Sequence, residues 1–273
     1  MIISKSSEKF KEMKDRIKFP NKYKYSTISD DLQVLEIALK FNLEIELLLY
    51  NYEEDYKDET KILLEKLKER ALEYYEISSS SYELIKTKEN HAGIIASIKT
   101  KEFNINDFKN KSFIVVLDRL EIPGNVGTIY RTLDSINCDG LILVDSVTKY
   151  YNSKITSSSR GSNLTIPTLE LSYDEALNFL LNNNYNIYLG EPKLGKNYKE
   201  YDYKERIAIV FGNERFGINP DWYNHKHIPV FIPMEGNHNS LNVAVATSII
   251  CYEAYMKRKK YWALFSVFLF LII

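Results

Sequence analysis

The feature that most constrains the fold is a series of short, continuous apolar runs in the second part of the chain. Five runs occur after residue 112, at 113–118, 140–145, 186–190, 207–212 and 230–233. Segments with helical spacing, such as 126–136 and 172–183, separate most of them. Continuous Val, Ile and Leu runs that alternate with helices are typical of a parallel sheet covered on both faces. The sequence therefore predicts an α/β domain over 112–260.

The glycines indicate where this domain binds a ligand. Nine of the ten glycines lie after residue 112, and most of those sit in or near loops that follow strands. Open parallel sheets bind ligands at the carboxyl ends of their strands, and glycine lets the backbone approach a ligand closely. We therefore expect four loops to gather on one side of the sheet, namely 119–127, 190–195, 212–217 and 234–240.

Several common signatures do not fit these loops. The segment 123–128 does not match the G-x-G-x-x-G of dinucleotide-binding folds, and no Walker-type G-K-S/T occurs, so a nucleotide-binding oxidoreductase is disfavoured. His238 and Ser240 lie two residues apart without a G-x-S-x-G elbow, which disfavours a nucleophilic hydrolase. His225 and His227 could ligate a metal, but no further ligands accompany them and we expect no metal site.

The first hundred residues are predicted to form a separate, smaller α/β domain. Helical spacing over 29–41 and 58–75 alternates with strand-like runs at 43–50 and 91–99. The polar segment 101–111 is a plausible linker to the second domain.

Charge is unevenly distributed in this first part. Residues 1–24 carry eight Lys or Arg against three acidic residues, a local balance of +5, although the whole chain has a net charge of −1. Such a segment can steer RNA, and a solvated, frayed terminus is the alternative. The acidic stretch 44–59 would repel RNA, so an RNA-binding face must lie elsewhere on this domain.

The cysteines and the C-terminal residues indicate where in the cell the protein is expected. Cys138 and Cys251 are too few and too far apart for a disulfide scaffold or a zinc site, which favours the reducing cytoplasm. The apolar run 261–273 follows the basic run 256–260. As a helix it would reach about 20 Å, short of the roughly 30 Å of bilayer hydrocarbon. We expect this tail to pack against the protein or a partner subunit, with a membrane anchor as the alternative.

Three segments of the second part resemble known signature motifs. They are "IPGNVGTIYRT" (122–132), "IVFGNERFGI" (209–218) and "IPMEGNHNSLNVAVA" (232–246). In this order and at roughly this spacing they resemble the motifs of the SpoU–TrmH family of RNA 2′-O-ribose methyltransferases, over about residues 112–258. The resemblance implies a SPOUT-like α/β domain with a deep trefoil knot and a homodimer. It also implies a ribosomal-protein-like α/β domain over 1–100 that binds RNA.

The resemblance further implies that S-adenosylmethionine is the methyl donor, bound in the knot. Gly212, Ile232 and Leu241 match positions that contact the donor through backbone and apolar walls. The full set of expected donor-binding residues is Gly212, Ile232, Leu241, Met234, Leu189, Gly190 and Gly217. For Ile232 and Leu241, plain core packing is the alternative interpretation.

The residues that match the family's catalytic positions are Arg131, Glu214, Asn125, Ser240 and Asn242. Arg131 is expected to clamp an RNA phosphate and to stabilise the developing alkoxide. It could instead act as a base, which is demanding because a guanidinium pKa exceeds about 12. A surface salt bridge is the alternative to both roles.

Other polar positions have structural alternatives. Asn125 and Ser240 are also good helix N-cap types, whereas Asn242 interrupts an apolar helical turn and has the weakest structural explanation. Glu214 is expected to hold Arg131 or to orient its loop. Arg160, in the loop 157–167, is a candidate RNA contact or a solvated arginine.

The resemblance thus implies an S-adenosylmethionine-dependent RNA 2′-O-methyltransferase, and the cysteine content favours the cytoplasm. Ribosomal RNA is favoured over transfer RNA because of the extra N-terminal domain. The alternatives are a transfer RNA enzyme and a catalytically silent RNA-binding protein on the same fold. The joint presence of Arg131, Glu214 and Asn242 favours an enzyme, since a silent protein would be free to lose them.

Overall fold

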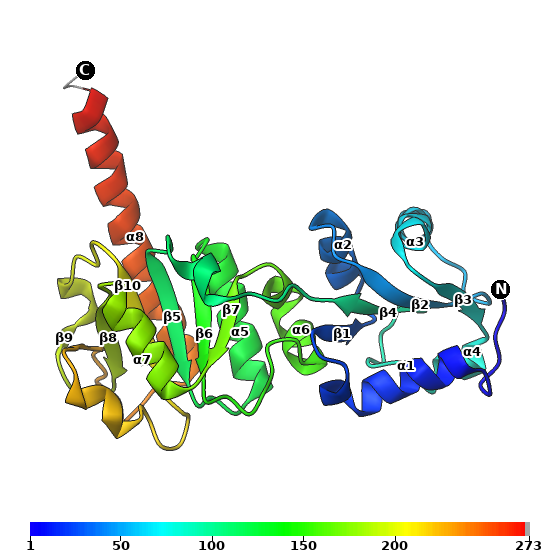
Figure 1. Cartoon of the computed structure of the whole chain (residues 1–273), viewed down its shortest axis with the longest axis horizontal. Helices are drawn as coiled ribbons and strands as arrows, with labels where there is room; N and C mark the ends of the chain where they lie inside the picture. The colour runs from blue at the N-terminus through cyan, green and yellow to red at the C-terminus, as the bar shows by residue number, and fades with distance from the viewer. Residues whose placement is uncertain (271–273) are drawn as a thin grey trace. The chain divides into compact units, whose positions relative to one another are not determined.

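The chain forms two compact units in the computed structural model (Figure 1). The structure describes residues 1–270 and the side chains of residues 1–259. The first unit comprises residues 1–102 together with 149–165, and the second comprises 103–148 together with the chain from 166 onward. The segment 149–165, which lies inside the predicted domain 112–260, therefore packs with the first unit. Most of the predicted linker, from 103 to 111, packs with the second.

The first unit is built around a mixed sheet with the strand order β1-β4-β2-β3, in which β4 is antiparallel to both neighbours and β2 is parallel to β3. Its strands are β1 (Ser26–Ser29), β2 (Ile45–Asn51), β3 (Tyr74–Ile77) and β4 (Ile94–Lys99). Its helices are α1 (Glu8–Lys18), η1 (Pro20–Lys22), α2 (Leu32–Lys40), α3 (Asp58–Arg70), α4 (Ser79–Tyr82), α6 (Ser153–Ser159) and η3 (Ser162–Leu164).

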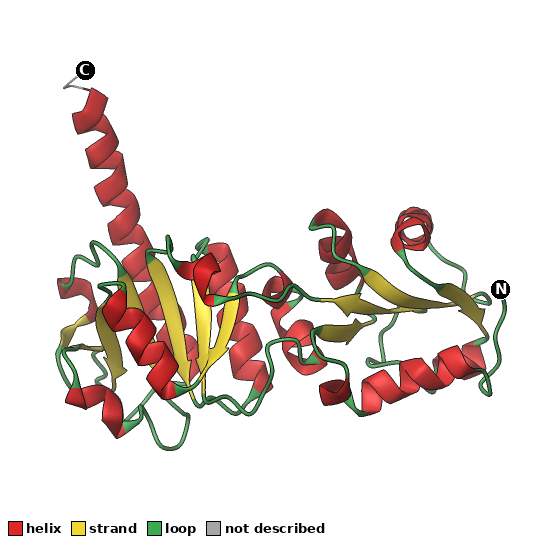
Figure 2. Cartoon of the chain, viewed as in Figure 1, coloured by secondary structure: helices red, strands yellow, loops and turns green. Residues whose placement is uncertain are grey.

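Helices cover both faces of this sheet (Figure 2). One apolar cluster joins α2 and α3 to the sheet, and a second joins α1 and α4 to the opposite face. The predicted helix 58–75 ends at Arg70, because the residues from Tyr74 onward pair with β2 as strand β3. The prediction was therefore wrong over its last turn, where two tyrosines suit a strand better than a helix.

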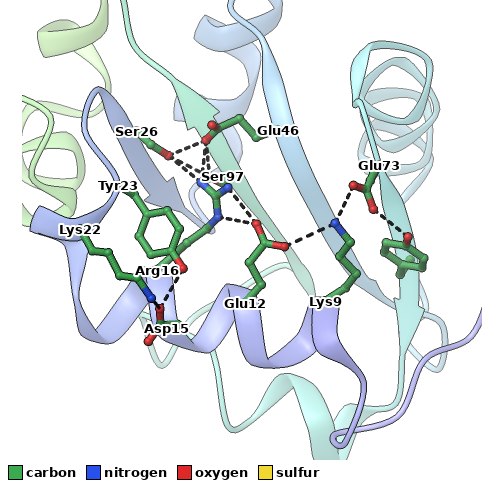
Figure 3. Close-up of polar contacts among 11 residues, drawn as sticks. Lys9, Glu12, Asp15, Arg16, Lys22, Tyr23, Ser26, Glu46, Glu73 and Ser97 are labelled. Atoms are coloured by element: carbon green, nitrogen blue, oxygen red, sulfur yellow. Dashed lines mark hydrogen bonds and ion pairs between the residues drawn. The ribbon is translucent and has the colours of Figure 1, made fainter.

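The basic N-terminal segment is an ordered helix that is tied to the sheet by ion pairs (Figure 3). Arg16 contacts Glu46 at 2.8 Å and Glu12 at 2.9 Å, and it also donates hydrogen bonds to two serines of the sheet. Lys9 pairs with Glu73 at 2.6 Å. The alternative of a frayed terminus is therefore wrong, and carboxylates neutralise part of the segment's positive charge.

In the second unit, seven strands of the described chain form one sheet in the order β7-β6-β5-β10-β8-β11-β9, and every neighbouring pair is parallel. The strands are β5 (Phe113–Asp118), β6 (Gly140–Val144), β7 (Thr168–Leu171), β8 (Asn186–Glu191), β9 (Lys196–Asn197), β10 (Ile207–Phe211) and β11 (Ile228–Phe231). The helices are η2 (Ile105–Phe108), α5 (Pro123–Ser135), α7 (Tyr173–Asn182), η4 (Tyr198–Glu200), η5 (Pro220–Asn224) and α8 (Val243–Phe270).

The predicted α/β class and parallel sheet are confirmed. The five apolar runs became β5, β6, β8, β10 and β11, while β7 and β9 were missed. The two missed strands are short and lie at the edges of the sheet, where a strand is less buried and carries polar residues. In Figure 1, α7 lies on one face of the sheet and α8 lies behind the other.

Strand order creates a crevice in this sheet. From β5 the chain continues through α5 to β6 on one side, whereas from β10 it continues to β11 on the other side. β5 and β10 are neighbours, so the loops that follow them diverge at the carboxyl edge. Such a switch point is where open α/β sheets bind ligands.

The last element, α8, extends to Phe270. The side chains of the apolar tail 261–273 lie outside the described residues, so its packing stays a prediction. Among the residues that the structure describes, no helix combines the length and apolar content that a bilayer crossing requires.

Candidate active site

A cavity of about 680 Å³ opens at the switch point of the parallel sheet. Its wall comes from the segments that follow β5, β8, β10 and β11, together with the first turns of α8. This volume suits a small-molecule ligand. The expectation that four loops gather at one side of the sheet is confirmed by the lining residues, which include members of all four.

Three predicted catalytic side chains form a hydrogen-bonded chain at this cavity. The Nδ2 of Asn242 donates to the Oδ1 of Asn125 at 3.1 Å, and the Nδ2 of Asn125 donates to the Oε1 of Glu214 at 2.9 Å. The backbone N–H of Glu121 lies 3.5 Å from the other oxygen of Glu214. Each signature motif thus contributes one member, and both amide side chains are fixed in orientation.

The structure corrects the predicted helix caps. Asn242 precedes α8, and its Oδ1 accepts from the backbone N–H groups of Ala244 and Val245 at 2.9 and 3.4 Å, so it is the residue that caps this helix. Ser240 is exposed, lines the cavity and makes no side-chain hydrogen bond among the described residues. Asn125 lies inside the first turn of α5 rather than at its cap, which is Ile122. Capping was therefore assigned to the wrong residues.

The loop after β10 is held in a tight turn. Asn213 and Gly217 exchange two backbone hydrogen bonds, of 3.0 and 2.9 Å, and Gly217 has a φ of +69° that favours glycine. The turn folds back over Gly212, where an added Cβ would lie only 2.2 Å from the carbonyl carbon of Gly217. Glycine at 212 is therefore required for the shape of the loop, whatever it contributes to a ligand.

Most of the residues expected to bind the donor line the cavity. Gly190, Gly212, Gly217, Ile232, Met234 and Leu241 all do so. Leu241 is 39% exposed, so core packing does not explain it. Leu189 instead points into the buried core on β8 and does not line the cavity, because side chains alternate between the two faces of a strand.

The two predicted arginines lie elsewhere. Arg131 is exposed on α5, does not line the cavity of its own chain, and has no hydrogen-bond or ion-pair partner among the described residues. Glu214 therefore holds Asn125 within one chain, and not Arg131. Arg160 belongs to the first unit, where it ends α6 with a φ of +51° and reaches Gln33 at 3.5 Å.

Glu191 and Tyr223 are among the cavity residues for which the sequence predicted no role. Glu191 follows Gly190 at the end of β8, and Tyr223 of η5 donates a hydrogen bond to its carboxylate. Burial and the hydrogen bond to Glu191 raise the pKa of the Tyr223 hydroxyl. The position of Glu191 directly after a glycine at the end of a strand could have indicated that it lies at the cavity. Tyr223 is distant from Glu191 in the sequence, and nothing in the sequence indicated that it lies there.

A family model decides the relationship. The model of the SpoU rRNA Methylase family matches residues 112–252, which is more than half of the chain and includes all three motifs. The chain belongs to the SpoU rRNA methylase family. The resemblance noted from the motifs is therefore confirmed, and with it the expected enzyme class, an RNA methyltransferase that uses S-adenosylmethionine.

Individual methyltransferases are similar to the chain over ranges longer than the motifs. It is 27% identical over 197 residues to the 23S rRNA (guanosine(2553)-2′-O)-methyltransferase RlmP of Bacillus subtilis, covering 72% of this chain and 77% of that protein. It is 32% identical over 142 residues to the 23S rRNA (adenosine(1067)-2′-O)-methyltransferase of Streptomyces azureus, covering 51% and 53%.

The fold also agrees with that of a solved structure. The crystal structure of an AdoMet-bound rRNA methyltransferase from Sinorhizobium meliloti matches with a TM-score of 0.81. The match covers 93% of this chain and 96% of that one at 22% identity. At this identity the likeness shows a shared fold for both units and leaves the roles of individual residues to be argued from this chain.

Proposed function

We propose that this protein transfers a methyl group from S-adenosylmethionine to a ribose 2′-hydroxyl of ribosomal RNA. The observation that carries the proposal is the Asn242–Asn125–Glu214 chain at the mouth of a cavity built from the three family motifs. Ribosomal RNA is favoured over transfer RNA because RlmP and the Streptomyces azureus relative are named for 23S rRNA.

The cavity fits the proposed donor by its chemistry. Ile232, Met234 and Leu241 form an apolar wall for an adenine ring, and glycine backbone beside it offers hydrogen bonds to the edge of the ring. Glu191 and Glu214 place carboxylates against a molecule that carries positive charge. S-adenosylmethionine, when bound, supplies a methyl group activated by the positive charge on sulfur.

The chain's own residues must orient the ribose and stabilise its oxygen as it becomes nucleophilic. The hydrogen bond between Asn125 and Asn242 fixes both side chains, so both are oriented before the substrate binds. Ser240 lines the cavity with a hydroxyl free of other hydrogen bonds among the described residues, and it is available to the ribose. We assign Arg131 the role of phosphate clamp and alkoxide stabiliser, since a guanidinium group presents several N–H donors that match the oxygens of a phosphate and of a developing oxyanion.

A second copy of the chain supplies Arg131 in this proposal. Arg131 does not line the cavity of its own chain, yet it lies on α5, which packs against α8 through a 2.7 Å hydrogen bond between Thr132 and Ser248. α8 exposes Val245, Tyr252 and Met256, each about half exposed, along one helical face. We propose that this apolar face pairs with its copy in a homodimer and brings Arg131 to the partner's cavity.

Three further parts of the proposal concern the fold and location. We propose that the chain between β11 and α8 passes through a deep trefoil knot, as the family resemblance implies. We propose that the first unit, with Lys11, Lys14 and Lys18 exposed on α1, binds RNA away from the acidic stretch 44–59. We place the protein in the cytoplasm, where its proposed substrate is.

Substitution of Arg131 tests the proposed mechanism. Arg131→Ala should leave the fold and donor binding intact, because the side chain contacts neither the core nor its own cavity. It should lower methyl transfer by about 100- to 1,000-fold, the usual effect of removing one group that stabilises a developing oxyanion. Calorimetry with S-adenosylmethionine and transfer assays on ribosomal RNA give the two readouts. Near-full activity in the variant would remove Arg131 from the mechanism.

Donor binding also separates the enzyme from a silent RNA-binding protein. A silent protein on this fold would not need the cavity, so the wild type should then bind no S-adenosylmethionine even at millimolar concentration. Binding in the micromolar range, lost in a Met234→Trp variant that fills the cavity, supports the enzyme.

A further inference from the structure

The tip of the loop over the cavity presents a cation and an aromatic ring side by side. Arg215 and Phe216 both line the cavity and both are exposed. Phe216 is 75% exposed, which places a large apolar ring in water. Arg215 has no hydrogen-bond or ion-pair partner among the described residues. Neither side chain is explained by the packing of its own chain.

The loop holds the backbone of these two residues in a fixed position. The Oδ1 of Asn213 accepts from the backbone N–H of Arg215 at 2.9 Å and from that of Phe216 at 3.2 Å. The Nδ2 of Asn213 donates to the carbonyl of Arg119 at 2.7 Å, which anchors the turn to the segment after β5. An exposed side chain on so constrained a turn is pre-organised to meet a ligand, since little backbone freedom is lost on binding.

Other apolar side chains at the same cavity are also exposed. Ile122 is 50% exposed and Leu241 is 39% exposed, and both line the cavity with Phe216. Single exposed apolar residues are ordinary on protein surfaces, but a group of them at the mouth of one cavity indicates a binding surface. These side chains come from the three different motif segments.

The occupant follows from the reaction assigned to the cavity, so the inference rests on the proposed function. A ribose oxygen can reach a donor inside the cavity only if its nucleotide leaves the RNA helix and its base loses its stacking partners. Aromatic side chains replace such partners, and arginine pairs with the adjacent phosphate. We propose that Phe216 stacks on the base of the nucleotide that is methylated and that Arg215 binds its phosphate.

The first test compares variants of the ring. Phe216→Ala should lower kcat/KM for ribosomal RNA from cells lacking the gene by about tenfold or more, in line with the loss of one base–aromatic stack. Phe216→Trp should retain most of the activity, and the Kd for S-adenosylmethionine should be unchanged in both. Val147→Ala is the matched control, because Val147 is 78% exposed in the same unit but does not line the cavity.

A binding readout keeps this inference separate from the proposed function. A single-stranded RNA octamer with 2-aminopurine at its centre should lose fluorescence on the wild type, in the presence of S-adenosylhomocysteine, and keep it on Phe216→Ala. Arg215→Ala should weaken binding of the octamer and reduce its salt dependence. If the wild type transfers no methyl group but still quenches the octamer, the proposed reaction fails and the stacking role stands.

Three outcomes would overturn the inference. Equal kcat/KM and equal quenching in the wild type and Phe216→Ala would show that the ring contacts no base. A loss in Val147→Ala as large as that in Phe216→Ala would show a general effect of the surface. A change of oligomeric state in Phe216→Ala, measured by light scattering, would assign the ring to a contact between subunits.

Discussion

At the scale of single residues, Asn242 illustrates how one side chain serves both structure and function. Its Oδ1 caps α8, and its Nδ2 donates to Asn125 in the cavity. The amide group suits both roles, because its oxygen accepts the backbone hydrogen bonds while its nitrogen donates to Asn125. The sequence alone indicated Asn242 by its place in a motif, but its capping role was missed because Asn242 was placed inside an apolar helical turn, whereas α8 begins at the next residue.

Two substitutions separate these roles of Asn242. Asn242→Asp keeps the cap and loses the donor, so we expect near-normal stability and a large loss of methyl transfer. Asn242→Ala loses both, and we expect an additional loss of about 1 kcal/mol in the free energy of unfolding. Denaturant titration and transfer assays measure the two effects. Equal activity of Asn242→Asp and the wild type would contradict the catalytic role of the donor.

Asp118 gives a prediction for pH. It is fully buried at the end of β5, and burial raises the pKa of its carboxyl above the usual 3.8, despite hydrogen bonds from Asn219 and Arg119. A carboxyl whose pKa is raised in the folded state stabilises the fold fully below pH 3.8. This stabilisation is lost as the pH rises through the raised pKa. The ionised carboxylate of Asp118 therefore lowers the stability of the fold at neutral pH.

Asp118→Asn should accordingly melt at the same temperature as the wild type or higher at pH 7. The difference should shrink as the pH is lowered toward 4, where the wild-type carboxyl takes up its proton. Melting curves between pH 4 and pH 8 measure this, with the exposed Glu235→Gln as a control that should follow the wild type. A variant that is less stable than the wild type at pH 7 would contradict the assignment.

At the scale of elements, α8 is held in place by a buried arginine. Arg258 donates to the carbonyls of Tyr203 and Glu205 at 3.0 and 2.6 Å and to the hydroxyl of Ser112 at 2.7 Å. Tyr203 and Glu205 both have positive φ angles, so the segment before β10 is in a strained conformation. Arg258 thus joins this segment, the start of β5 and the helix that begins at the cavity.

Removal of this guanidinium should destabilise the second unit. We expect Arg258→Met to lower the free energy of unfolding by about 3 kcal/mol, because several buried acceptors lose their donor. Lys257→Met is the matched control on the next residue, and it should change stability by less than about 1 kcal/mol since Lys257 is partly exposed. Denaturant unfolding compares the two. Similar losses in both variants would show that Arg258 is not a specific clamp.

The elements also show what the sequence could and could not predict. Continuous apolar runs identified the central strands because burial on both faces leaves little choice of residue. The edge strands β7 and β9 lacked this constraint, and α6 was not separated from the second domain because its few serine-rich turns carry no domain signal. The motifs identified the cavity loops. Arg215 and Phe216 lie inside the motif segment 209–218, but no role was expected of them, and only their exposure in the structure indicates one.

For the molecule as a whole, the proposed active site requires two copies of the chain. Mixed dimers test this directly. Arg131→Ala and Met234→Trp are each expected to be inactive alone, the first for lack of the clamp and the second for lack of the cavity. The two variants are mixed in equal amounts, unfolded and refolded together. In each mixed dimer, one site then combines the intact cavity of the Arg131→Ala chain with the intact arginine of the Met234→Trp chain. We expect roughly one quarter of wild-type activity, from the statistics of a two-fold dimer.

No recovery in the mixture would place Arg131 and the cavity in the same chain. Light scattering must first show that mixed dimers form. A wild type that is monomeric at assay concentration and fully active would equally contradict a site shared between subunits.

Following a labelled methyl group from donor to RNA tests the proposed reaction itself. The purified chain is incubated with methyl-tritiated S-adenosylmethionine and ribosomal RNA from cells that lack the gene, and the RNA is digested to nucleosides. We expect label in a single 2′-O-methylated nucleoside, and no such label with Arg131→Ala. Label on a base, or donor binding without any transfer to ribosomal RNA, would contradict it.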